Sequence, residues 1–164
     1  MALNKILRPY YINDLIRIGH KSDGGYIIGK KILANAENVI TFGLFDEFSF
    51  EKNIKKLKKK IKIICFDHTV THFFWLMHFG KWMLLSIRFR SLELFKRSFT
   101  FLNYYYFFFK KASHKKLKIV SEIKFKNETS LNEIINKYKI DSKKTILKID
   151  IDLDEYKILK NILI

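Results

Sequence analysis

Three apolar runs in the sequence are each followed by residues that could bind a ligand. A turn that contains Gly43, Leu44 and Asp46 follows the first run, and Asp67 and His68 follow the second. Glycine lets a backbone approach a ligand closely, and a carboxylate can accept hydrogen bonds from both hydroxyls of a ribose. These residues together indicate a site for a cofactor of the adenosine type.

An acidic cluster follows the third run. Asp150 and Asp152 are its first two acids, and Asp154 and Glu155 complete it. A carboxylate beside a reacting hydroxyl can remove its proton or hold it in position. Asp150 and Asp152 are therefore the candidate catalytic residues.

Other kinds of site have weaker support. The chain has neither GxGxxG nor GxxxxGK[ST], which argues against ordinary NAD binding and nucleotide hydrolysis. His68 and His72 lack a HExxH glutamate and a cysteine at zinc spacing, so no metal site is expected. The single Cys65 lies inside a predicted strand and cannot form an internal disulfide, which favours a reducing compartment, the cytoplasm.

The elements that must position these residues alternate between strands and helices. Residues 39–43 and 60–67 have the composition of buried strands, and between them Ser49 can cap a helix with Glu51 in its first turn. This βαβ unit predicts parallel strands with a right-handed crossover.

Residues 117–164 repeat the alternation. Strands are expected at 117–123 and 145–151, a helix with a capping box begins at Ser130, and 153–164 form a final helix. The pattern predicts an α/β fold with an open, mostly parallel, Rossmann-like sheet. Ligands of such sheets bind beyond the carboxyl ends of the strands, where the candidate residues would meet.

An aromatic and basic segment, 71–116, interrupts this pattern and predicts two helices, through 74–82 and 92–109. It contains nine Lys or Arg residues but only one acid, Glu93. Such a segment can associate with an anionic membrane surface or a polyanion, or its aromatics can pack over the sheet. Its most apolar stretch, 73–87, is too short to cross a membrane.

The chain carries a formal net charge of +16, with 27 Lys and five Arg. Arg is the residue whose planar fork suits base edges and phosphates, so this balance argues against nucleic acid as the partner. A codon bias toward Lys is an equally good source of the charge.

Five stretches resemble the FkbM-like S-adenosylmethionine-dependent methyltransferases and occur in that family's order. They are RIGHKSDGGY (17–26), FGLFDEFSFE (42–51), FDHT (66–69), TSLNEI (129–134) and LKIDID (147–152). The last two are the most specific, being similar to a family helix start and to its LKIDIEGAE pattern.

The resemblance implies a methyltransferase-type sheet, S-adenosylmethionine as cofactor, and O-methyl transfer to a sugar or another small polar acceptor. Gly43 to Asp46 would line the methionine and adenosine, Asp67 would hold the ribose, and Asp150 would lie near the reacting end.

The sequence departs from the family in two places. Leu153 stands where the family has the glycine of its Glu-Gly-Ala-Glu motif, and the sequence ends after the fourth of seven expected strands. A truncated domain is therefore expected, with its activity open. Residues 145–151 would then form an exposed sheet edge through which chains self-associate.

The 164 residues are expected to form one domain. Its four parts are an N-terminal extension with a DGGY turn (1–38), the first βαβ unit (39–70), the helical insertion (71–116) and the second β-α-β-α half (117–164).

Overall fold

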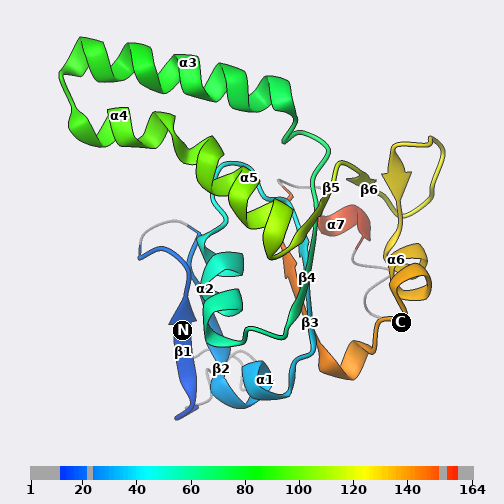
Figure 1. Cartoon of the computed structure of the whole chain (residues 1–164). Helices are drawn as coiled ribbons and strands as arrows, with labels where there is room; N and C mark the ends of the chain where they lie inside the picture. Colours follow the sequence, from blue (N-terminus) through cyan, green and yellow to red (C-terminus); the bar gives the residue numbers. More distant parts are fainter. Residues whose placement is uncertain (1–11, 22–23, 152–154, 159–164) are drawn as a thin grey trace, which may run out of the picture.

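The computed structural model describes residues 12–21, 24–151 and 155–158. At its centre lies a parallel sheet of four strands in the order β5-β4-β3-β8 (Figure 1). The strands are β3 (Asn38–Phe42), β4 (Lys62–Phe66), β5 (Ser113–Lys115) and β8 (Thr145–Ile149). The predicted α/β class with an open parallel sheet is confirmed.

The strand order reverses at β3, which pairs with β4 on one side and with β8 on the other. The strand predicted at 145–151 therefore lies beside the strand predicted at 39–43. Among the described residues no strand pairs with the outer side of β8, so this strand is an edge of the sheet.

The prediction that residues 117–123 form a strand of the central sheet is wrong. The strand that joins the sheet is β5, which pairs with β4, whereas β6 (Lys118–Ile119) pairs with β7 (Glu128–Thr129) in a separate small sheet. The apolar residues of 117–123 gave the strand signal, but the amide of Asp67 bonds to the carbonyl of Lys115 and thereby aligns the earlier segment with β4.

Helices cover both faces of the sheet (Figure 1). One face carries α1 (Lys30–Asn35), α2 (Ser49–Leu57) and the hairpin of β1 (Leu15–Ile18) and β2 (Tyr26–Gly29). The other carries α6 (Leu131–Tyr138) and α7 (Glu155–Ile158), and a short 3-10 turn, Ser142–Lys144, leads into β8. Alternate residues of β3, β4 and β8 supply the two apolar cores, as a buried parallel sheet requires.

The helix starts confirm one predicted cap and correct another. Ser130 caps α6, because its Oγ accepts a 3.3 Å hydrogen bond from the amide of Glu133. Ser49 does not cap α2 but is its first helical residue, and its amide donates to Glu47 Oε1 at 2.6 Å. The acceptor that serves this helix start therefore lies two residues earlier than predicted.

The insertion consists of three helices rather than two: α3 (His72–Phe89), α4 (Leu92–Ser98) and α5 (Thr100–Lys110). The second predicted helix is divided at Phe99, where the hydroxyls of Ser98 and Thr100 donate back to the carbonyls of Phe95 and Arg97. Helices α3 and α4 project beyond the sheet (Figure 1). None of the helices in the described ranges combines the length and apolarity that crossing a bilayer requires.

Candidate functional site

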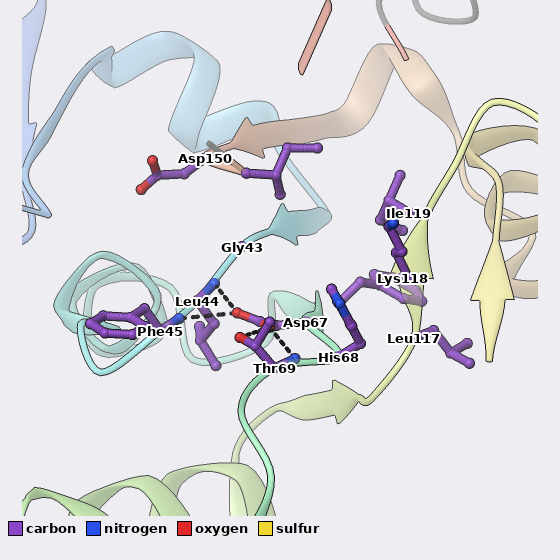
Figure 2. A pocket seen from close by; sticks show the side chains of 12 residues that line it. Gly43, Leu44, Phe45, Asp67, His68, Thr69, Leu117, Lys118, Ile119 and Asp150 are labelled. Atoms are coloured by element: carbon purple, nitrogen blue, oxygen red, sulfur yellow. Dashed lines mark hydrogen bonds between the residues drawn. The ribbon is translucent and has the colours of Figure 1, made fainter. Parts of the chain in front are cut away.

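A cavity of about 300 Å³ lies at the carboxyl ends of β3, β4 and β8 (Figure 2). Five of the predicted site residues line it: Gly43, Leu44, Asp67, His68 and Asp150. Parallel strands bring their carboxyl ends to one edge of a sheet, which is why residues more than 100 positions apart in the chain meet here. Asp152, the second predicted catalytic residue, lies outside the described residues.

The glycine of this turn is required by backbone packing. Gly43 has a φ of +79°, and a Cβ at this position would lie 1.7 Å from the carbonyl oxygen of Asp150. The amide of Gly43 also donates to the carbonyl of Phe66, at 3.1 Å. The turn therefore needs glycine in order to pass between the ends of β4 and β8.

Asp67 ties the two loops beside the cavity together (Figure 2). Its Oδ2 accepts hydrogen bonds from the amides of Leu44 and Phe45, at 2.8 and 3.1 Å. Its Oδ1 accepts from the amide and the hydroxyl of Thr69, at 2.8 and 2.6 Å. These four donors occupy about as many acceptor sites as a carboxylate has. The carboxylate that was predicted to bind a ribose therefore binds the two loops.

The same hydrogen bonds keep Asp67 ionised. Burial opposes ionisation of the carboxyl group, but the hydrogen bonds from Thr69, Leu44 and Phe45 outweigh it, so the pKa of Asp67 lies below its ordinary value. Asp67 is therefore a fixed negative charge at the floor of the cavity.

Asp150 is an exposed residue in the lining of the cavity. Its Oδ2 accepts a 2.7 Å hydrogen bond from the hydroxyl of Tyr26, in β2. Its backbone is fixed as well, because its amide donates to the carbonyl of Phe42 at 2.8 Å. Asp150 is thus a positioned carboxylate that can accept a further hydrogen bond or a proton.

Asp46, predicted to bind the cofactor, is absent from the lining of the cavity. The backbone turns at Phe45, whose φ is +47°, and Asp46 points toward the helical insertion. Its Oδ2 lies 3.1 Å from Arg97 Nη2 and 3.0 Å from His78 Nε2. Asp46 therefore connects the loop after β3 to α3 and α4.

The other wall of the cavity contains residues that the sequence analysis did not assign to the site. Leu117, Lys118 and Ile119 lie opposite Leu44 and Phe45 in Figure 2. The sequence analysis predicted these residues to lie within a strand at 117–123, so it did not consider them as ligand-binding residues. No spacing signal in the sequence connects them to the loops.

Below the loops, His114 connects β5 to Asp67. Its Nε2 lies 2.9 Å from the backbone oxygen of Asp67, and its Nδ1 bonds to the hydroxyl of Tyr104. Burial lowers the pKa of His114, although the Asp67 carbonyl and carboxylate oppose this shift. A neutral ring with a proton on Nε2 satisfies both contacts, so His114 serves as a structural link.

Within 12–21, 24–151 and 155–158, no group of three or more His, Cys, Asp or Glu side chains is arranged to hold a metal ion. Comparison of the chain with protein-family models, with curated proteins and with solved structures gives no match. The interpretation of the cavity therefore depends on its position in the sheet and on its lining residues.

Proposed function

We propose that the chain binds S-adenosylmethionine in the cavity and transfers its methyl group to an oxygen of a small polar acceptor such as a sugar. The observation that carries this proposal is the position of the cavity, at the carboxyl ends of β3, β4 and β8, with the exposed residue Asp150 in its lining. The resemblance of 147–152 to an FkbM-like motif supports the same assignment.

Two charged residues of the lining support binding of the charged end of the cofactor. The methionine part carries a sulfonium, an ammonium and a carboxylate. Asp150 offers a negative partner for the two cations, and Lys118 offers a positive partner for the carboxylate. Leu44, Phe45 and Ile119 offer apolar surface for the adenine.

The lining departs from the cofactor at the ribose. Because Asp67 bonds to the loops through both oxygens, it is not available to the ribose hydroxyls in this conformation. His68, an exposed neighbour that lines the same cavity, is the polar side chain that we assign to the ribose. The role of Asp67 is then to hold the amides and side chains of the two loops in place.

Bound S-adenosylmethionine would supply an activated methyl group. The acceptor hydroxyl would lose its proton as its oxygen forms a bond to the methyl carbon, and the bond between that carbon and the sulfonium sulfur would break, which leaves the demethylated product. Asp150 would take this proton, or would orient the hydroxyl by accepting its hydrogen bond. Tyr26 would hold the Asp150 carboxylate in place through the 2.7 Å hydrogen bond.

Isothermal calorimetry with S-adenosylmethionine and with its demethylated product tests the proposal. Wild-type protein is expected to bind both, and Asp150→Asn is expected to bind S-adenosylmethionine about tenfold more weakly because it loses a charge-assisted contact. Glu93→Gln is the matched control, since it removes one exposed carboxylate on α4, outside the cavity lining.

Failure of the folded wild-type chain to bind either compound would contradict the proposal. Equal affinity of the wild type and Asp150→Asn for S-adenosylmethionine would show that the Asp150 carboxylate does not contribute to binding. Weakening of the same size in Glu93→Gln would show that net charge, rather than a defined contact, governs the binding.

A further inference from the structure

The outer face of α3 is apolar and exposed along most of the helix. Phe73, Leu76, Met77, Leu84 and Ile87 have between 58% and 70% of their surface exposed. With 3.6 residues per turn, their side chains fall within an arc of about 100° and extend over about 21 Å of the helix. We name these five residues the α3 stripe.

The opposite face of α3 is packed, which fixes the direction of the stripe. Trp75, His78 and Ser86 are buried on that face. Trp82 lies beneath the guanidinium of Arg97, with 4.0 Å between its ring centroid and the guanidinium carbon. These contacts hold α3 against α4, which runs beside it (Figure 1), and leave the α3 stripe on the opposite, exposed face.

Nothing in the described part of the chain crowds the stripe at its centre. Gly80 lies within the same arc, and a Cβ at this position would have no atom within 4 Å. Monomeric proteins rarely leave a continuous apolar surface of this kind in water. The α3 stripe is therefore suited to contact with an apolar phase.

The charged residues of α3 beside the stripe are positive. Lys81 and Arg88 border it on α3, Arg90 follows at the end of the helix, and all three are exposed. The 18 residues of α3 include no Asp or Glu. An apolar face bordered by cations is typical of helices that lie in the headgroup region of anionic membranes.

We propose that the α3 stripe docks on the surface of an anionic lipid bilayer, with α3 lying in the plane of the interface. Lys81, Arg88 and Arg90 would then contact lipid phosphates while the stripe enters the acyl boundary. A second copy of the chain is a poorer occupant, because two such faces would bring the same cations together without an acid in either α3. This inference does not depend on the proposed function.

Vesicle flotation tests the proposal with the whole chain. Wild-type protein is expected to float with phosphatidylcholine vesicles that contain about 30% phosphatidylglycerol and to stay behind with pure phosphatidylcholine. Leu76→Glu/Leu84→Glu is expected to lower the bound fraction about tenfold, because it places two charges on the apolar face. Asn53→Glu/Asn132→Glu is the matched control: it adds the same charge at exposed positions of α2 and α6 and should float like the wild type.

Three outcomes would overturn the proposal. The first is wild-type protein that does not float with the anionic vesicles. The second is equal flotation of the wild type and the Leu76→Glu/Leu84→Glu variant, which would mean that charge alone drives the binding. The third is a dimer, detected by light scattering without lipid, that these two substitutions convert to a monomer, since the stripe would then be covered by a second chain. Circular dichroism of both variants checks that they fold.

Discussion

Among single residues, Asp67 helps to shape the cavity through the hydrogen bonds of its carboxylate. Four donors from Leu44, Phe45 and Thr69 converge on its carboxylate, and they hold the loops after β3 and β4 at a fixed separation. A carboxylate that is hydrogen-bonded in this way contributes to stability as well as to shape.

Asp67→Asn should lower the free energy of unfolding by about 2–3 kcal/mol at neutral pH, because an amide cannot accept hydrogen bonds on both sides. The folded pKa of Asp67 lies below its ordinary value, so this stabilisation is present above the unfolded pKa of about 3.9 and disappears as the pH falls through the lower, folded value. Urea unfolding at a series of pH values measures the difference between the two proteins.

The exposed Glu122 provides the control, since Glu122→Gln should have little effect at any pH. The free energies of unfolding of the wild type and Asp67→Asn could differ by the same amount at neutral pH and below the pKa of Asp67 in the folded state. In that case the charged carboxylate would not be the source of the stabilisation.

At the scale of the elements, one row across the sheet is polar although its surroundings are apolar. The strand register aligns Lys148 of β8, Thr41 of β3 and Cys65 of β4. Above this row lies the buried Glu51 of α2, whose Oε1 accepts from Thr41 Oγ1 at 2.8 Å and lies 3.4 Å from Lys148 Nζ. A buried ion pair thus joins the helix of the first βαβ unit to the edge strand.

Lys148→Met should destabilise the chain by about 3–5 kcal/mol, because it leaves the buried Glu51 carboxylate without its cation. Adding Glu51→Gln to Lys148→Met should then cost much less than Glu51→Gln costs in the wild type. Urea unfolding of the two single variants and the double variant gives a coupling energy, expected to be about 1–3 kcal/mol. Additive effects of the two substitutions would exclude a stabilising pair.

Some of the strands and helices could be predicted from the sequence, and others could not. The two strands around α2, and β8, follow from their apolar runs, and the start of α6 follows from its capping box. The short β5 could not be found, because Ser113–Lys115 has neither apolar alternation nor β-branched residues and becomes a strand by pairing with β4. The buried position of Glu51 was hidden as well, because an acid in a first helical turn is ordinarily exposed.

The sequence could predict those residues of the cavity that directly follow the end of a strand. Asp67 and Asp150 follow directly from the ends of β4 and β8. Asp46 does not line the cavity, because the chain turns at Phe45 in the left-handed region, which composition does not show. Tyr26 was not assigned to the site because it reaches Asp150 from a hairpin 124 residues away in the sequence.

At the scale of the whole molecule, the strand β8 has one side that no strand pairs with among the described residues. Its inner side pairs with β3, and the amide of Asp150 continues this pairing toward Phe42. Because successive residues of a strand direct their backbone groups to alternate sides, Leu147 and Ile149 present theirs to the free edge. We propose that two chains pair through this edge.

Size-exclusion chromatography with light scattering should therefore show a mass that increases with protein concentration. Ile149→Pro removes one outward amide and should shift the protein toward monomer, whereas Ile149→Val keeps that amide and should behave like the wild type. A monodisperse wild-type monomer over the whole concentration range would contradict association through β8.

The central claim, that the cavity at the strand ends is a cofactor site, is tested most directly by a crystal structure of the chain grown with S-adenosylhomocysteine. We expect the adenine to lie between Leu44 and Ile119 and the amino acid end to lie within hydrogen-bonding distance of Asp150, with Asp67 still bonded to the amides of Leu44 and Phe45. Density for the compound elsewhere on the chain, or a cavity without the compound in crystals grown at saturating concentration, would contradict the account.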